Sequence, residues 1–408
     1  MNMSGQRGKK RWQYLVLVML VLGAYGYWTL GRPLPSIKPV AASSQLQRQT
    51  PASQIIWPSS GQAALNVSRT SIAETHGSQI PVPIASTAKL ITALVVLQKK
   101  PLTLGQQGPL ITLNDSDVAL YNAYAAQDGS VVRVVTGEQI SEYQMLQTML
   151  LPSANNMADS LAIWAFGSLK AYSMAANQAL EDFSLVTTHV GSDASGLSPT
   201  TTSTARDLAR IGVLTVQNPV LAQIVNQPTA SGIPVVGTIK NVNTLLGSDN
   251  IIGIKTGNSD QAGGVFVTAA RVIVDNQPTT IVGSVVGTPS LFSALKSGLT
   301  LIDSAQRNFT SIDLVKIGTV AGSYVVPWGG GIPAIASTDL SVSIWKGNPA
   351  TATIKLNPLP ATAKVGQTTG TISTKTLDGH ATKSIPITLK ASPTKPSVWW
   401  RLLHPISI

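Results

Sequence analysis

Residues 83–97, PIASTAKLITALVVL, decide the fold, because an apolar helical pattern here carries a serine and a lysine three residues apart, Ser86 and Lys89. The pattern predicts a buried helix that begins at Ser86. Residues i and i+3 lie on one face of a helix, so Lys89 can reach the Ser86 hydroxyl. A serine hydroxyl attacks at neutral pH only when such a base is close to it. The stretch therefore indicates a helix that presents a nucleophile.

Two further polar motifs follow at wide separations, Ser-Ala-Asn at residues 153–155 and Lys-Thr-Gly at residues 255–257. The first lies at a predicted break between two helical segments, SEYQMLQTMLL and NNMADSLAIWAF. The second lies on a predicted strand, NIIGIKTG, and the apolar run GGVFVTAARVIV follows as its hairpin partner. A helix, a helix break and a strand can supply separate walls of one cleft.

Three other segments have similar spacing: Ser-Asp-Asn at 248–250, Ser-Ala-Leu-Lys at 293–296 and Lys-Ser-Gly at 296–298. Ser248 lies in a polar turn only a few residues before Lys255, so it cannot form an independent wall of a cleft. A further alternative is structural: Ser86 as a helix cap, Lys89 as a solvated lysine, and the 255–257 motif as a strand end. The occurrence of all three motifs in order argues against that alternative.

The chemistry of the first motif requires a neutral lysine. Burial or a neighbouring cation favours the neutral form, and Lys255 is the expected second cation. At a helix N-terminus, Ser86 would also have unpaired N–H groups and the helix dipole beside it, which stabilise an oxyanion. The predicted oxyanion donors are the backbone N–H groups of Ser86 and Asn258.

The three motifs resemble those of the serine penicillin-recognising enzymes in order and in separation. A finer match is to the low-molecular-weight penicillin-binding proteins of the serine-type D-alanyl-D-alanine carboxypeptidase family. That match rests on PIASTAKLITALVVL, EQISEYQMLQTMLLPSANNMA, THVGSDASGLSPTTTSTARDLARI, NVNTLL, and GIKTG with Ala262 and Gly263 after it. The resemblance covers about residues 60–305. It implies an α+β fold, a transpeptidase-like domain of antiparallel sheet and helical subdomain followed by a small all-β domain.

The resemblance also implies a role for each matching residue, and a reaction that removes the terminal D-alanine from peptidoglycan pentapeptides. Ser86 is similar to the acylated nucleophile, Lys89 to its base, and Ser153 to the hydroxyl that relays a proton to the leaving amine. The implied substrate-binding residues are Asn155, Lys255, Thr256, Gly257 and Asn258. No metal or cofactor is implied, and β-lactams are implied as covalent inhibitors.

Two positions depart from the family pattern: Asn258 replaces an aromatic, histidine or hydroxyl side chain, and Asn156 replaces a common acid. Neither departure removes a catalytic group, but the resemblance does not define the substrate preference or the rate of deacylation. A class A β-lactamase is one alternative, but Glu181, the only glutamate between the second and third motifs, lacks that family's E-x-x-x-N pattern. A catalytically silent wall-peptide-binding protein is another alternative, although it would not need an activated hydroxyl.

The chain of 408 residues divides into six predicted segments. We expect a basic cytoplasmic segment at 1–11, a transmembrane helix at 12–31, a linker at 32–57, the catalytic domain at 58–306, a β domain at 307–391 and a tail at 392–408. Trp399, Trp400 and Arg401 make this tail a candidate interfacial membrane segment. A cleaved signal peptide is the alternative for residues 12–31, with Ala24-Tyr25-Gly26 as a weak cleavage site.

Charge and composition limit the partners. The net charge of +11 comes from the two ends, since residues 1–50 and 305–408 each carry +7 and the middle carries −3. Basic ends around a near-neutral body fit a bacterial membrane surface rather than a nucleic acid. The positive-inside rule then predicts a single-pass protein with its catalytic domain outside the cytoplasm. No cysteine is present, and the four histidines show no metal-ligand spacing, so thiol and metal chemistry are not expected.

Overall fold

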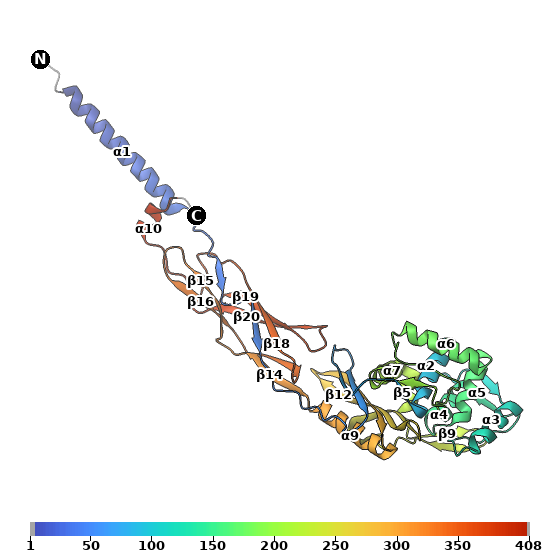
Figure 1. The fold of residues 1–408 in the computed structure, drawn as a ribbon. Coiled ribbons are helices and arrows are strands. Elements are labelled where there is room, and N and C mark those ends of the chain that lie inside the picture. Colours follow the sequence, from blue (N-terminus) through green and yellow to red (C-terminus); the bar gives the residue numbers. More distant parts are fainter. Residues whose placement is uncertain (1–4, 406–408) are drawn as a thin grey trace. The chain divides into compact units, whose positions relative to one another are not determined.

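The computed structural model of the chain describes residues 5–405, which form two compact units (Figure 1). The first unit is residues 52–309 and contains all three motifs. The second unit combines residues 1–51 with residues 310–408, so both ends of the chain belong to it.

A five-stranded antiparallel sheet forms the centre of the first unit, in the spatial order β11, β12, β13, β3, β4. Its strands are β3 (Gln62–Val67), β4 (Ala73–His76), β11 (Ile251–Ser259), β12 (Gly263–Val274) and β13 (Gln277–Thr288). The strands predicted from the late apolar runs are therefore neighbours. β11, which carries the Lys-Thr-Gly motif, is an edge strand, and an edge strand can accept an extended peptide.

Helices and short strand pairs complete the first unit. The helical elements are η1 (Ala85–Ala88), α2 (Lys89–Lys99), α3 (Asp115–Ala125), α4 (Glu142–Leu150), α5 (Asn155–Phe166), α6 (Leu169–Asp182), α7 (Ala205–Gln217), α8 (Pro219–Val225), η2 (Ser248–Asn250) and α9 (Leu291–Gln306). The short strands pair as β5 (Val82–Pro83) with β8 (Thr202–Ser203), β6 (Leu110–Thr112) with β7 (Gln139–Ser141), and β9 (Thr229–Ile233) with β10 (Gly237–Lys240).

Two helices cover the opposite faces of the sheet. Gly212 lets α7 approach β13, because a Cβ there would lie 2.7 Å from Val282. The next strand residue, Gly283, faces Ile302 of α9, at 3.3 Å from an added Cβ. Successive strand residues point to opposite faces, so α7 and α9 enclose the sheet between them. The sheet is thus buried on both sides and forms a rigid support for β11.

The helix that we expected to begin at Ser86 begins one turn later. Residues 85–88 form the 3-10 turn η1, and α2 starts at Lys89. Neither element has a side-chain cap, so the interpretation of Ser86 as a helix cap is wrong. A 3-10 turn has three residues per turn, so the side chains at i and i+3 lie directly above one another. The turn therefore brings Lys89 over Ser86.

The second unit is built around a seven-stranded sheet in the order β1, β15, β16, β20, β19, β18, β2, with β14 and β17 as a separate pair. Its strands are β1 (Pro39–Ala41), β2 (Gln45–Arg48), β14 (Phe309–Val315), β15 (Val320–Val325), β16 (Gly331–Ala336), β17 (Leu340–Trp345), β18 (Ala350–Leu356), β19 (Thr368–Lys375) and β20 (Thr382–Leu389). Buried Tyr324, Ile372 and Ile387 are part of its core.

The predicted linker at 32–57 is not a free spacer. Its strands β1 and β2 pair with β15 and β18 at the two edges of the seven-stranded sheet. Ile37 is fully buried and forms a backbone bridge with Leu359. The segment has no apolar period because these short strands are held by main-chain hydrogen bonds, which do not depend on side-chain pattern.

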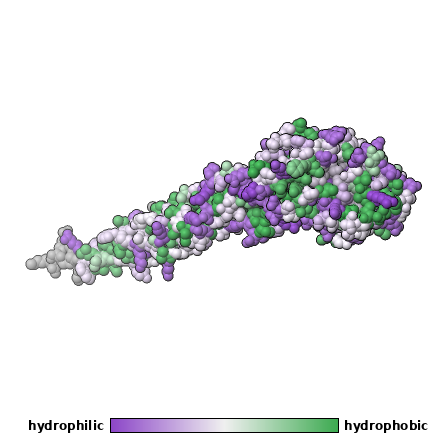
Figure 2. Space-filling model, turned by 90° about the horizontal axis from the view of Figure 1, so that it is seen from below, coloured by the Kyte–Doolittle hydropathy of each residue, from purple (hydrophilic) through white to green (hydrophobic). Residues whose placement is uncertain are grey.

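The N-terminal helix α1 (Gly5–Gly31) contains, at Arg11–Gly31, a segment long and apolar enough to cross a membrane. Figure 2 shows hydrophobic residues exposed along this helix. Residues 1–4 of the predicted basic segment lie outside the described residues. The length of this segment matches the hydrocarbon thickness of a bilayer, and its apolar composition suits the hydrocarbon core.

The C-terminal helix α10 (Val398–Leu403) contacts the end of α1. Arg401 donates to the carbonyl of Leu30, and Arg32 donates to the carbonyl of His404. Tyr25 also donates a 2.6 Å hydrogen bond to the carbonyl of Leu402. The last carbonyls of a helix have no partner inside the helix. Arg401 of α10 therefore satisfies a carbonyl at the end of α1, and Arg32, the residue after α1, satisfies the carbonyl just past the end of α10.

Candidate active site

The three motifs of the first unit lie together. η1 and α2 carry the first motif, the connection between α4 and α5 carries the second, and β11 carries the third. An added Cβ at Gly257 would lie 3.1 Å from the carbonyl of Ile84 and 3.2 Å from the backbone nitrogen of Ser86. β11 thus packs directly against the turn that holds Ser86, and a side chain at Gly257 would crowd this contact.

Ser86 and Lys89 form the first half of the site. Lys89 Nζ lies 2.8 Å from Ser86 Oγ, within hydrogen-bond distance. Lys89 Nζ also lies 2.7 Å from Asn155 Oδ1 and 3.0 Å from the carbonyl of Ser195. Lys89 is fully buried, and burial lowers its pKa to about 7, although the charges of Asp193 and Asp159 act in the opposite direction. Near neutral pH, Lys89 can therefore hold or release a proton beside Ser86.

Ser153 and Lys255 form the second half of the site. Lys255 Nζ donates to Ser153 Oγ at 2.9 Å and to the carbonyl of Thr256 at 3.0 Å. Lys255 is 1% exposed, and burial lowers its pKa, with a further contribution from the charge of Lys89. Ser153 has a positive φ of 67°, a left-handed conformation that is rare outside glycine and asparagine. The break between α4 and α5 thus holds this hydroxyl toward β11.

The remaining predicted site residues occupy the same region. Asn155 is 2% exposed at the start of α5 and bonds Lys89, and Thr256 is 4% exposed on β11. Asn258 is exposed and pairs with Gly264 of β12 in the ladder. The structure brings Ser86, Lys89, Asn155, Ser153 and Lys255 into direct hydrogen-bond contact as two sets, and it places Thr256, Gly257 and Asn258 on the adjoining edge strand.

Asn156, the second departure from the family pattern, has a structural partner. Its side chain accepts from the backbone N–H of Val132 at 3.1 Å and donates to the carbonyl of Val132 at 2.9 Å. Asn156 is fully buried. An amide can make both bonds, whereas an ionised acid can only accept. Asn156 therefore fixes the backbone at Val132, in the connection between α3 and β7, next to the start of α5.

Sequence reasoning missed a set of buried polar groups behind Lys89. The carbonyl of Ser195 accepts from Lys89, and the carboxylates of Asp193 and Asp159 lie close enough to raise its pKa. Tyr124 donates a 2.6 Å hydrogen bond to Asp159. The segment SDASGL at 192–197 was a usable signal, because its small and acidic residues form part of the family resemblance.

The alternative motifs lie elsewhere in the first unit. Ser248 belongs to η2, and Lys296 is exposed on α9. Glu181, the acid considered for a β-lactamase, is exposed on α6.

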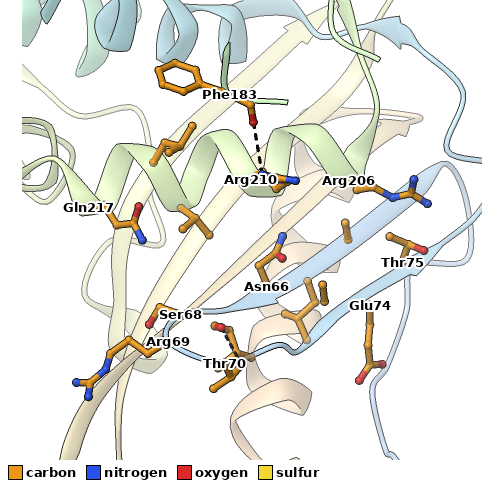
Figure 3. A pocket seen from close by; sticks show the side chains of 16 residues that line it. Asn66, Ser68, Arg69, Thr70, Glu74, Thr75, Phe183, Arg206, Arg210 and Gln217 are labelled. Carbon is orange, nitrogen blue, oxygen red and sulfur yellow. Dashed lines mark hydrogen bonds between the residues drawn. The ribbon is translucent and has the colours of Figure 1, made fainter. Parts of the chain in front are cut away.

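A separate pocket lies between α7 and the β3–β4 hairpin and has a volume of about 570 Å³ (Figure 3). Figure 3 shows Arg69 and Arg206 at opposite ends of this pocket, while Arg210 donates to the carbonyl of Phe183. Its cationic groups do not converge on one point, and no residue of the three motifs lines it.

Comparison with known proteins gives a consistent result. The sequence pattern of the family described as D-alanyl-D-alanine carboxypeptidase matches residues 65–285. A D-alanyl-D-alanine endopeptidase of Pseudomonas aeruginosa is 33% identical over 215 residues, which are 51% of this chain and 65% of that protein. The D-alanyl-D-alanine carboxypeptidase DacA of Escherichia coli is 26% identical over 318 residues, 74% of this chain and 75% of that protein.

Solved structures share the fold. Penicillin binding protein 5 from Haemophilus influenzae aligns with a TM-score of 0.56 at 21% identity, covering 83% of this chain and 98% of that one. A Streptomyces DD-transpeptidase aligns with a TM-score of 0.54 at 22% identity, covering 63% of this chain and 98% of that one. These likenesses show an α+β transpeptidase-like fold, as the sequence predicted. The chain spans just under two thirds of the endopeptidases that it matches.

Proposed function

Because the chain belongs to the D-alanyl-D-alanine carboxypeptidase family, we propose that it removes the terminal D-alanine from peptidoglycan stem peptides through an acyl-enzyme on Ser86. One observation carries the proposal: Lys89 Nζ lies 2.8 Å from Ser86 Oγ and is buried, so it can be neutral near pH 7. A neutral amine at that distance is a competent general base for the hydroxyl.

Acylation begins at the Ser86 hydroxyl and ends with the release of D-alanine. Lys89 Nζ takes the Ser86 proton while Oγ attacks the carbonyl between the last two D-alanines. The oxyanion is held by the backbone N–H groups of Ser86 and Asn258. The C–N bond then breaks, and the proton that Lys89 took from Ser86 passes through the Ser153 hydroxyl to the leaving amine. Free D-alanine departs, and water later hydrolyses the ester.

Substrate recognition is assigned to the edge strand and the start of α5. The Lys255 amine, with the Thr256 hydroxyl, supplies hydrogen-bond donors that suit the free carboxylate of the terminal D-alanine. The peptide lies as an added strand along β11, where Gly257 leaves room for its backbone. Asn155 binds the peptide amide. The same groups would accept a β-lactam, which carries both a reactive carbonyl and a carboxylate.

An endopeptidase is the second candidate, because two relatives at 33% and 30% identity are named D-alanyl-D-alanine endopeptidases. Such an enzyme cuts a D-alanyl bond whose amine belongs to a crosslinked stem peptide rather than to a free D-alanine. Lys255 is 1% exposed and bonds the Ser153 hydroxyl, and this enclosed position favours a small terminal group such as D-alanine. Parallel digestion of a linear peptide ending in D-Ala-D-Ala and of a crosslinked stem dimer distinguishes the two activities.

The other two alternatives fit less well. A class A β-lactamase needs a free acid to activate the deacylating water. Asp159 and Asp193, which lie between the second and third motifs, already accept hydrogen bonds from protein donors. A silent binding protein has no use for a buried lysine beside a free hydroxyl. Release of D-alanine by the purified chain, and its loss in Ser86→Ala, would support the peptidase over both.

We also propose that α1 is a retained membrane anchor and that the catalytic unit faces the outside of a bacterial membrane. Support comes from the apolar span at Arg11–Gly31 and from the basic residues that precede it. α10 adds exposed Trp399 and Leu403 next to the end of α1, where a headgroup layer would lie. Cleavage after residue 26 would remove Tyr25, one of the contacts of α10. The intact mass of the membrane-extracted protein tests retention.

A further inference from the structure

A buried carboxylate, Asp159, lies behind the proposed general base. Its oxygens accept from the Tyr124 hydroxyl at 2.6 Å and from the backbone N–H of Ala194 at 2.8 Å. Asp159 is 2% exposed on α5, Tyr124 lies on α3, and Ala194 belongs to the loop that follows α6. Asp159 thus joins three separate segments. No step of the proposed reaction uses it directly.

The loop at residues 193–198 is held tightly. Asp193 accepts from the backbone N–H groups of Gly196 at 2.9 Å and Ser198 at 2.8 Å. Gly196 packs so closely on η1 that an added Cβ would lie 2.1 Å from the carbonyl of Ala85. The Ser195 carbonyl in this loop lies 3.0 Å from Lys89 Nζ. The position of that carbonyl therefore depends on the anchors of the loop.

The hydrogen-bond requirements of Lys89 make this carbonyl important. A neutral amine has two N–H groups and one lone pair, whereas an ammonium has three donors. The Asn155 Oδ1 atom and the Ser195 carbonyl are two fixed acceptors, and neither can donate to nitrogen. They occupy both N–H groups of the neutral amine. The lone pair is then left for the third neighbour, Ser86 Oγ, which holds the proton to be removed.

We propose that Asp159 is a positioning residue for this base: by anchoring Ala194 and Tyr124 it fixes the Ser195 carbonyl, which directs the Lys89 lone pair at Ser86. The inference rests on the proposed function of the same site. Loss of the anchor would let the loop shift and the amine rotate, so the hydroxyl would lose its aligned acceptor. Misplacement by about 1 Å can cost about 10²-fold in rate.

The charge of Asp159 has a separate, measurable effect. The titratable groups around Lys89 are Asp159 on α5, Asp193 in the loop, Lys255 on β11, Tyr124 on α3 and Tyr172 on α6. Burial raises the pKa of Asp159 to about 6, so it is largely ionised where Lys89 titrates. Its negative charge raises the Lys89 pKa. Removing that charge lowers the Lys89 pKa, and the base then stays neutral at lower pH.

Three variants separate position from charge: Asp159→Ala removes both, Asp159→Asn removes the charge and keeps the shape, and Tyr124→Phe removes one hydrogen bond. Asp303→Asn is the matched control, because Asp303 is a partly exposed acid paired with Arg307 on α9. The measurement is acylation by a penicillin between pH 5 and 9, resolved into an initial dissociation constant and an acylation rate constant. Thermal unfolding verifies that each variant is folded.

We expect Asp159→Ala to lower the acylation rate constant about 10- to 100-fold with little change in the initial dissociation constant. Asp159→Asn should restore most of the rate but move the acidic limb of the pH profile down by about half a unit or more. Asp303→Asn should match the wild type. An Asp159→Ala variant within about twofold of the wild type, or an Asp159→Asn limb that does not move, would overturn the proposal.

The outcome stays decisive if Asp159→Ala does not fold. Tyr124→Phe must then lower the acylation rate constant while the initial dissociation constant is unchanged, and a wild-type rate in this variant counts against the proposal. Failure of the proposed function looks different, since the wild-type protein would then form no adduct at Ser86 at any pH. A wild-type adduct with unaffected Asp159 variants removes only this inference.

Discussion

Lys255 Nζ lies 2.9 Å from Ser153 Oγ, although 102 residues separate the two side chains in the sequence. The contact joins the helix break to the edge strand, and Lys89 lies close enough for its charge to lower the pKa of Lys255. It also gives Lys255 two roles that can be separated by experiment, one toward a substrate carboxylate and one toward the Ser153 hydroxyl.

Lys255→Ala should chiefly weaken recognition of the terminal carboxylate, because it removes a charge-assisted hydrogen bond on the edge strand. The measurement compares acylation by a peptide ending in D-Ala-D-Ala with acylation by its C-terminal amide. The variant should lose much more on the acid than on the amide, whereas Lys89→Ala should lose equally on both. An equal loss in Lys255→Ala would show that Lys255 does not read the carboxylate.

Acylation by the wild-type protein should fall as the pH drops through about 7, because protonation of Lys89 removes the base that accepts the Ser86 proton. The base form exists above the pKa, so the activity is present at higher pH and lost at lower pH. Stopped-flow acylation across this range gives the midpoint. A rate that is flat from pH 5 to 9 would exclude Lys89 as the base.

Asn156→Asp should destabilise the first unit by about 1–3 kcal/mol, since a carboxylate would face the Val132 carbonyl without a hydrogen to donate. Urea unfolding measures the loss. Asn122→Asp is a suitable control, because Asn122 is exposed on α3 and no side-chain hydrogen bond of this kind would be lost. A variant as stable as the wild type would mean that the Val132 contacts contribute little.

Gly257→Ala should lower acylation strongly while the fold is retained. The added methyl would press on the Ile84 carbonyl and the Ser86 nitrogen at 3.1–3.2 Å, and it would narrow the path of a peptide along β11. Gly331→Ala is the control, because an added Cβ there meets nothing within 4 Å. Wild-type acylation in Gly257→Ala would show that the substrate does not approach this part of the strand.

The membrane proposal predicts a contribution from the C-terminal helix. A protein that lacks residues 1–32 and is exported with a cleavable signal should remain partly membrane-bound. The bound fraction should fall at high salt or when the chain ends before Val398, because exposed Trp399 and basic Arg401 make a weak interfacial contact. A shortened protein that is wholly free of membranes with its tail intact would show that α10 serves only to contact α1.

The residues that the sequence singled out as a site do lie together, whereas the strands within the expected linker were not predicted. Ser86, Lys89, Ser153 and Lys255 were recognisable because each stands out as a polar residue against an apolar element, in an order shared by one family. The strands β1 and β2 were not recognisable, since they lie at sheet edges and depend on main-chain pairing. The proposed role of Asp159 depends on Tyr124 and Ala194, which are distant from it in sequence. A motif of closely spaced residues therefore could not indicate it.

The most direct test of the central claim is the intact mass of the purified protein after exposure to a penicillin. A nucleophilic Ser86 whose neighbouring acids, Asp159 and Asp193, already accept hydrogen bonds from protein donors should accumulate a stable penicilloyl adduct, which peptide mapping places on Ser86. The Ser86→Ala variant should carry no adduct, and its rate of D-alanine release should fall by several orders of magnitude. A wild-type protein without the mass increment, or a Ser86→Ala variant that retains it, would contradict the account.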